Sequence, residues 1–159
     1  MKKKTRARLK QDSGSTGDLE PGQLGKNQVE IYIDGASRGN PGDAGIGILI
    51  KEADGKTREI TKYLGTKTNN QAEYTALIEA LESAKELNGH PIRIFTDSLL
   101  VANQVNGLWK VKHAEIIPLN KKARSLFAGF DDITIRHIPR EQNSQADRLA
   151  NLAIDEYFN

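Results

Sequence analysis

The sequence contains no cysteine, and this absence excludes several classes of protein at once. With 0 Cys among 159 residues, the chain cannot form a disulfide scaffold, a thiol nucleophile, or a zinc or iron–sulfur site with cysteine ligands. Long apolar runs are also missing: the longest, Ile46–Ile50, contains a glycine, whereas a membrane span needs about 20 residues. No apolar stretch follows the N-terminal lysines, so we expect no secretory signal and a soluble protein of the cytoplasm.

The chain also has little net charge, and that charge is unevenly distributed. It carries 23 Lys+Arg and 21 Asp+Glu, a formal charge of +2. Residues 1–28 hold seven cations and three anions, which gives this segment +4. The other 131 residues hold 16 cations and 18 anions, a net charge of −2. The basic excess therefore belongs to the N-terminal segment, and charge alone does not indicate that the body binds nucleic acid.

The first 28 residues are polar, rich in Gly, Ser and Lys, and without apolar periodicity. Such a segment buries too little apolar surface to offset the entropy lost on ordering it. We therefore expect residues 1–28 to be a disordered basic tail and residues 29–159 to be the folded domain. The tail is either a passive solvated segment or a mobile arm that attracts a phosphate backbone.

From residue 29 onward, apolar periodicity predicts strands and helices. Alternating apolar and polar side chains predict a first strand that ends at Asp34-Gly35, and the following residues 35–44 are rich in turn formers. Asp54-Gly55 indicates a hairpin between the next two strands. The predicted strands cover 29–34, 45–51, 57–64, 92–97 and 133–137, and the predicted helices cover 69–88, 98–106, 115–128 and 143–158. This order predicts an α/β fold in which helices pack on a mixed sheet.

Three acidic residues occupy unusual positions in these elements. Glu73 begins the apolar stripe of its helix, where a carboxylate must be paired, bound to metal or at the wet edge of the stripe. A glutamate in the first turn of a helix also suits the helix dipole. Asp34 and Asp97 each end an apolar strand, so in parallel neighbouring strands they would lie side by side, about 5 Å apart. Taken singly, Asp34 also suits a turn and Asp97 a helix N-cap.

Asp147 borders the apolar stripe of the last helix, either as a solvated flank or as a fourth member of this group. Four converging carboxylates would repel one another unless a hard cation lay between them. Mg²⁺ prefers carboxylates, water and phosphate oxygens, and two such ions about 3.5–4 Å apart can clamp the attacking and leaving oxygens of a phosphoryl displacement. The sequence contains no GxxxxGK[ST] loop, so NTP hydrolysis has no support.

Four ordered motifs are similar to those of ribonuclease H type I. They are YIDGASRGNPG (32–42), TNNQAEYTAL (68–77), FTDS (95–98) and HIPREQNSQADRLAN (137–151), in a match that spans residues 29–155. The resemblance implies a ribonuclease-H-like fold, with a five-stranded mixed sheet flanked by helices. It also implies Mg²⁺- or Mn²⁺-dependent endonucleolytic hydrolysis of the RNA strand of RNA/DNA hybrids, which leaves 3′-hydroxyl and 5′-phosphate ends.

The resemblance also implies roles for individual residues. Asp34, Glu73, Asp97 and Asp147 match the four metal-binding catalytic carboxylates, of which Asp34 and Asp97 are expected to touch both metal ions. Other matching positions are expected to bind the substrate, whose RNA strand is distinguished by its 2′-hydroxyl groups. These positions are Gly35, Ala36, Arg38, Gly39, Asn40, Asn69, Asn70 and Ser98.

Two features depart from the pattern of some members of that family. An accessory residue before Asp147 is expected to be His137, which has the usual offset of ten residues but ends a predicted strand, or Arg140. The His-x-Pro-Arg-Glu sequence resembles a subgroup in which the position of Arg140 serves this role, and we favour Arg140. Residues 109–113 contain no dense basic run, so the basic protrusion of some members is absent. Trp109 either packs against the DNA strand or belongs to the core.

The leading hypothesis is an active ribonuclease specific for RNA/DNA hybrids, with two Mg²⁺ ions or Mn²⁺ as a substitute. We expect it to be a monomer with no small-molecule cofactor and no membrane partner. Two alternatives remain open. One is a nucleic-acid-binding module of the same fold with little catalysis, and the other is a nuclease of the same superfold that acts on DNA or on junctions.

Overall fold

The computed structural model describes residues 20–22, 25 and 27–159. The prediction of disorder for residues 1–19, 23–24 and 26 therefore lies outside the described residues.

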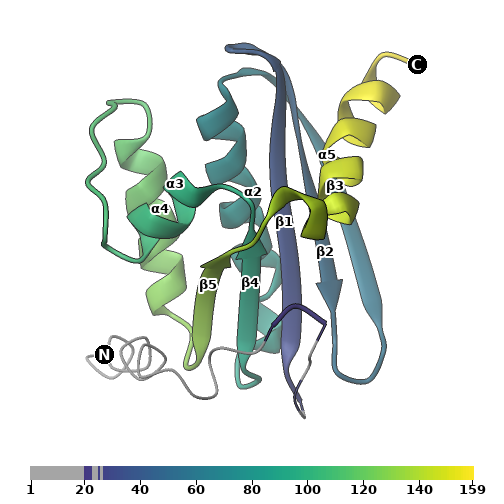
Figure 1. Ribbon diagram of the computed structural model, residues 1–159, viewed down its shortest axis with the longest axis vertical. Helices are drawn as coiled ribbons and strands as arrows, with labels where there is room; N and C mark the ends of the chain where they lie inside the picture. The colour runs from purple at the N-terminus through teal and green to yellow at the C-terminus, as the bar shows by residue number, and fades with distance from the viewer. Residues whose placement is uncertain (1–19, 23–24, 26) are drawn as a thin grey trace.

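The described chain folds around a five-stranded sheet with strand order β3-β2-β1-β4-β5 (Figure 1). Strands β1, β2 and β3 form an antiparallel meander, whereas β4 runs parallel to both β1 and β5. The strands are β1 (Val29–Gly39), β2 (Gly42–Lys51), β3 (Thr57–Lys67), β4 (Ile92–Thr96) and β5 (Ile133–His137). The predicted α/β fold with a five-stranded mixed sheet is confirmed.

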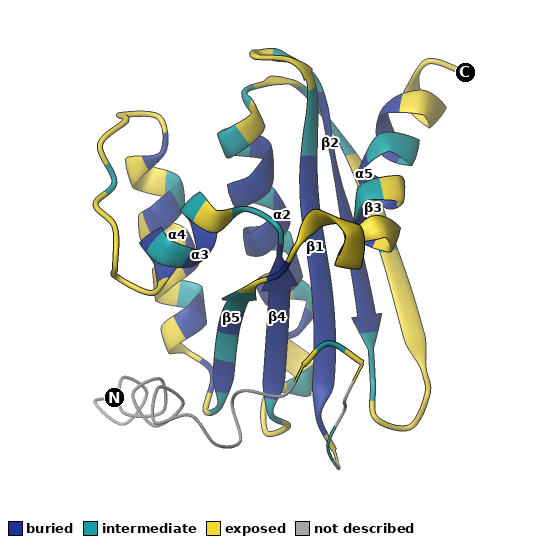
Figure 2. Cartoon of the chain, in the orientation of Figure 1, coloured by how far each residue is buried: buried dark blue, intermediate teal, exposed yellow. Residues whose placement is uncertain are grey.

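Helices cover both faces of this sheet. They are α2 (Asn69–Ser83), α3 (Leu99–Val105), α4 (Ile117–Ala128) and α5 (Ser144–Tyr157), with short 3₁₀ helices η2 (Lys85–Leu87) and η3 (Arg140–Gln142). Side chains of α2, α3 and α4 form the larger core with one face of the sheet, and α5 packs on the opposite face in a smaller core. Figure 2 shows the central strands buried over most of their length and the edge strand β3 largely exposed. Among the described residues, no helix combines the length and apolar character that crossing a bilayer requires.

The first hairpin is longer than the sequence predicted. We expected the first strand to end at Asp34 and residues 35–44 to be a turn, but β1 continues to Gly39 and β2 begins at Gly42. Residues 35–39 pair with residues 42–46, so cross-strand hydrogen bonds override the turn preference of this Gly- and Asn-rich stretch. The β1–β2 hairpin consequently extends beyond the end of β4, the strand on the other side of β1.

Two further boundaries differ from the prediction. The helix expected over 69–88 ends at Ser83 and continues as η2, a tighter geometry that is common at helix ends, before Gly89 with φ of +110°. The hairpin at Asp54-Gly55 is confirmed, but its loop covers residues 52–56, and Gly55 is the residue there with positive φ.

Two glycines of β2 let helix α5 lie directly against the sheet. A Cβ atom added at Gly47 would lie 2.3 Å from the carbonyl oxygen of Ala146. One added at Gly45 would lie 2.7 Å from the carbonyl oxygen of Ala150. Both distances are too short for a real contact, so larger side chains at these positions would push α5 away from β2.

Residues 20–22, which we call the strap, lie on the same face of the sheet as α5. The backbone N–H of Gly22 donates to Glu30 Oε2 at 2.7 Å, and the Tyr32 hydroxyl donates to Glu30 Oε1 at 3.0 Å. Glu20 forms an ion pair with Arg136 on β5 at 3.0 Å. Glu30 is only 2% exposed, so the strap supplies a hydrogen bond to a buried carboxylate.

Removing residues 1–27 should therefore destabilise the domain more than removing residues 1–19. The longer deletion takes away the Gly22 donor, and a hydrogen bond to a charged group contributes about 1.5–3 kcal/mol. Urea unfolding followed by circular dichroism would give both free energies of unfolding. Equal stabilities for the two truncated proteins would show that the strap contributes nothing.

Candidate metal centre and active site

Asp34 and Asp97 lie side by side because β1 and β4 are parallel neighbours. The last residue pair of these two strands is Ile33 with Thr96, so the next residue of each strand emerges at the same edge. Beyond this point β1 continues along β2 but no longer pairs with β4. The predicted arrangement of the two aspartates is confirmed, with Asp34 inside a strand rather than at its end.

Glu73 reaches the same place because α2 packs very closely on β1. A Cβ atom at Gly35 would lie 2.3 Å from the carbonyl carbon of Ala72, so a glycine is needed where the helix crosses the strand. The Gly35 N–H donates to Glu73 Oε1 at 3.0 Å. The helix start is fixed by a capping box in which Thr68 and Gln71 exchange side-chain-to-backbone bonds of 3.1 and 2.9 Å. Glu73 lies beyond the first turn of this helix, so the helix dipole does not explain it.

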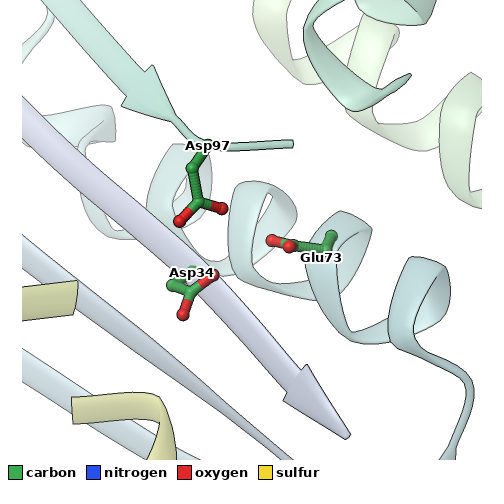
Figure 3. Close-up of side chains that lie close together, drawn as sticks. All are labelled: Asp34, Glu73 and Asp97. Carbon is green, nitrogen blue, oxygen red and sulfur yellow. The ribbon is translucent and has the colours of Figure 1, made fainter. Parts of the chain in front are cut away.

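These three carboxylates form a compact cluster (Figure 3). One oxygen from each of Asp34, Glu73 and Asp97 lies within 4.8 Å of the others. Asp34 is 4% exposed and Glu73 is 5% exposed, whereas Asp97 is half-buried. Figure 3 shows the side chains from β1, α2 and the residue after β4 pointing toward one another. We call this group the acidic cluster.

Asp147 completes the group from the opposite side of the sheet. It lies in the first turn of α5, and it is close enough to Asp34 to contribute to the raised pKa of that carboxyl. Its side chain is 34% exposed, and its Oδ1 lies 3.7 Å from the Arg140 guanidinium. Asp147 is thus more accessible than the buried Asp34 and Glu73.

Burial and mutual repulsion disfavour the ionised form of the acidic cluster. Desolvation is the main cause of the raised pKa of Asp34, and the charges of Glu73 and Asp97 raise it further. Burial also raises the pKa of Glu73, followed by the charge of Asp97, while the Gly35 N–H lowers it. The pKa of Asp97 is raised by burial and lowered by the Asn143 amide and by Arg140.

This donor set fits a hard divalent cation. The cluster offers only carboxylate oxygens as ligands. Mg²⁺ and Mn²⁺ bind well to such oxygens, whereas softer metals prefer nitrogen or sulfur ligands. A bound cation would also remove the repulsion that raises the three pKa values, because it favours the ionised carboxylates. The residues present therefore suit the metal that the sequence predicted.

A cavity of about 220 Å³ opens over the cluster. Its walls contain all four carboxylates, so the structure brings the predicted catalytic acids into one space. It also contains several residues predicted to bind substrate or to assist catalysis. These residues are Gly35, Ala36, Arg38, Asn69 and Arg140, and two residues that the sequence did not single out, Ser37 and Asn151, also line the cavity.

Comparison with known proteins agrees with this geometry. A family model described as reverse transcriptase-like matches residues 32–153. Ribonuclease HI of Halobacterium salinarum is 43% identical over 142 residues, which cover 89% of this chain and 70% of that protein. The chain belongs to the ribonuclease HI family.

Solved structures of this family superpose on the described fold. Ribonuclease H1 from the archaeon H. salinarum has a TM-score of 0.76 at 45% identity, covering 81% of this chain and 98% of that one. LC11 ribonuclease H1, from compost, was solved in complex with an RNA/DNA hybrid. It also has a TM-score of 0.76, at 38% identity, covering 82% of this chain and 99% of that one. The chain spans 36% of the length of several mycobacterial relatives.

Four other predicted substrate residues of this ribonuclease HI chain do not line the cavity but adjoin, in sequence or through a hydrogen bond, residues that do. Asn40, at the hairpin tip, accepts a hydrogen bond from the Asn69 N–H at 3.0 Å, which ties the hairpin to the start of α2. Gly39 adjoins Asn40, and Asn70 follows Asn69 on α2. Ser98 caps α3, where its Oγ accepts from the Val101 N–H at 3.2 Å.

Arg140 and His137 flank the acidic cluster differently. Arg140 lines the cavity with a side chain that is 80% exposed, and it approaches Asp147. His137 ends β5 and is exposed. Both lower the pKa of Asp97, with Arg140 the stronger influence. Arg140 is thus the nearer of the two to the predicted site, and the accessory role stays a prediction.

Arg38 is already paired within the protein. Its guanidinium lies 2.7 Å from the Asp155 carboxylate and donates to both oxygens of Asn151 at 3.3 Å. The sequence reasoning missed Ser37 and Asn151 as cavity residues. Both lie inside the matching motifs, which was the available signal, but only the pairing of β1 with β2 and the seating of α5 bring them to the cavity.

Trp109 lies on the surface rather than in the core. It is about half exposed, and its neighbour Leu108 is more exposed still. Backbone bonds from both residues to the Asn103 carbonyl, at 2.8 and 3.2 Å, fix the start of this loop. The Gln104 amide donates to the Lys110 carbonyl at 3.1 Å. The loop therefore presents the Trp109 indole to solvent on a fixed backbone. The core alternative for Trp109 is excluded, and packing against a DNA strand stays a prediction.

Without metal, the protein should lose stability as the pH rises. The folded state holds the pKa of Asp34 at about 9, against about 4 in an unfolded chain. Between these values the folded state binds more protons, so its free energy of unfolding falls with increasing pH. Asp34→Asn removes this effect and should make the chelator-treated protein more stable than wild type at about pH 8, with the gain shrinking toward about pH 4.

Urea unfolding across this pH range, with chelator present, measures the effect. Asp131→Asn is the matched control, because Asp131 is exposed and belongs neither to the acidic cluster nor to the cavity wall. This variant should show no such gain. Parallel pH profiles for wild type and Asp34→Asn would contradict the raised pKa of Asp34.

Proposed function

We propose that this protein is an endoribonuclease that hydrolyses the RNA strand of RNA/DNA hybrids. The observation that carries the proposal is the convergence of four carboxylates, from β1, α2, the end of β4 and α5, in one cavity of a ribonuclease HI chain. A family relative was solved with an RNA/DNA hybrid bound, which supports the hybrid as the substrate class.

The proposed cofactors are two Mg²⁺ ions, with Mn²⁺ as a substitute. Asp34, Glu73, Asp97 and Asp147 would hold them, with Asp34 and Asp97 contacting both. When bound, such ions activate water and stabilise charge at the reacting phosphate. Attack by water on phosphorus with loss of the 3′-oxygen then leaves 3′-hydroxyl and 5′-phosphate ends. The protein supplies rigid carboxylates, since Asp34 and Glu73 are buried and cannot reorient freely.

Recognition of the RNA strand is proposed to use backbone and amide groups beside the cavity. Gly35 and Ala36 line its wall, and Asn69 joins them there. Asn40 holds Asn69 in place, so the hairpin tip and the start of α2 present one polar surface. Amides and peptide groups of this kind both donate to and accept from a 2′-hydroxyl, which distinguishes RNA from DNA.

Arg140 is proposed as the accessory residue at the rim of the cavity. Its exposed guanidinium can follow a phosphate group or a departing product, since its one ion pair among the described residues is a 3.7 Å contact to Asp147. We further propose that the protein acts as a monomer in the cytoplasm, without a small-molecule cofactor.

The cleavage assay tests the central proposal. Wild-type protein with Mg²⁺ should cut RNA paired to DNA and should leave RNA/RNA, DNA/DNA and branched DNA largely intact. Asp34→Asn and Asp97→Asn should each abolish turnover with the fold retained by circular dichroism, while Asp131→Asn should keep wild-type activity. Hybrid binding without cleavage in Mg²⁺ and Mn²⁺ titrations would instead favour a binding module. Preferred cutting of branched or duplex DNA would favour a different nuclease.

The basic residues of the N-terminal segment are proposed to strengthen hybrid binding. Residues 1–19 hold six cations and two anions, and deleting them leaves the strap in place. The full chain should bind hybrid more tightly, with a dependence of log K on log[salt] that is steeper by up to about 0.9 for each phosphate that the segment neutralises. Binding of catalytically inactive Asp34→Asn, with and without residues 1–19, measures the slope. Identical slopes would show that the segment takes no part.

A further inference from the structure

Asn143 lies at the start of α5 but does not cap this helix. An asparagine at such a position ordinarily accepts a backbone N–H with its side-chain oxygen. Asn143 makes no capping bond, and its buried Oδ1 has no hydrogen-bond partner within the described structure. The residue is 1% exposed. A missing cap and an unpaired buried acceptor are both unfavourable, so the orientation of this amide calls for a reason.

The two N–H groups of the amide supply that reason. Asn143 Nδ2 donates to the Ile33 carbonyl at 2.9 Å, directly before Asp34 and at the point where β1 loses its β4 neighbour. The same amide approaches the Asp97 carboxyl closely enough to favour its ionised form and so lower its pKa. An asparagine amide has two N–H donors on one nitrogen, so turning the nitrogen toward β1 and Asp97 leaves the oxygen unpaired.

Asn143 also belongs to the turn that carries the fourth carboxylate. The backbone N–H of Asp147 donates to the Asn143 carbonyl at 3.1 Å, which is the first helical bond of α5. One buried residue thus contacts the strand that carries Asp34, the Asp97 carboxyl, and the helical turn of Asp147.

We propose that Asn143 is a positioning residue that fixes Asp97 and Asp147 relative to Asp34 for metal binding. The proposal rests on the proposed function, since it assumes that these carboxylates bind divalent cations. Loss of the amide would leave Asp97 and the start of α5 free to shift, and residues that orient metal ligands typically change metal affinity by about 10–100-fold. Replacement of Asn143 by aspartate would replace the N–H donor with a carboxylate oxygen, which would face two other acceptors, the Ile33 carbonyl and the Asp97 carboxyl.

Another buried asparagine provides a matched control. Asn120, on α4, donates to the Tyr74 hydroxyl at 2.9 Å and is also buried. It lies in the larger core and contacts none of the four carboxylates among the described residues. Asn120→Ala should therefore destabilise the fold without changing metal affinity.

Mn²⁺ titration by calorimetry on chelator-treated protein tests the proposal. Wild type and Asn120→Ala should bind with similar affinity, whereas Asn143→Ala and Asn143→Asp should bind about 10–100-fold more weakly. Should Asn143→Ala fail to fold, Asn143→Ser, which keeps one hydroxyl donor, carries the same test and should bind with intermediate affinity.

The outcomes separate the two ideas. If wild type itself binds no divalent cation, the proposed function fails whatever Asn143 does. If wild type binds Mn²⁺ and the folded Asn143 variants bind it as tightly as Asn120→Ala does, the positioning role is overturned and Asn143 is merely a buried structural residue.

Discussion

Repulsion among three carboxylates held within 4.8 Å is the constraint that the rest of this structure serves. Two of them are almost fully buried, so water cannot screen their charges. They stay together because separate elements enforce the approach. Parallel pairing of β1 with β4 places Asp34 beside Asp97, and the missing side chain of Gly35 lets α2 bring in Glu73. A site that opposes its own ionisation in this way favours a cation strongly.

The four carboxylates are not held equally. Asp34, Glu73 and Asp97 come from elements that build the larger core, whereas Asp147 comes from α5, which packs in the smaller core on the other face. Asp147 is also more accessible than Asp34 and Glu73, and it lies beside the exposed guanidinium of Arg140. The arrangement combines three carboxylates held by the larger core with a fourth that a different layer of the fold brings to the same cavity.

The sequence predicted five strands and their succession with the helices along the chain, the side-by-side aspartates and the cluster with Glu73. These features follow from apolar periodicity and from strand ends, which are local signals. The extension of β1 to Gly39 was missed because pairing with β2 outweighs the turn preference of the residues between Gly35 and Gly39. The role of Asn143 was also missed, since its partners, Ile33 and Asp97, are distant in sequence. Local patterns favour a helix cap at that position, and only the tertiary structure shows the amide turned to β1.

Strand β2 contributes none of the four carboxylates, yet it sets the position of one of them. Its two glycines, Gly45 and Gly47, determine how closely the backbone of α5 approaches the sheet, and Asp147 moves with that helix. The spacing between Asp147 and the acidic cluster is therefore adjustable from outside the site. A designer who wished to suit the proposed metal centre to a larger cation could keep all four carboxylates and add side-chain volume at one glycine beneath the helix.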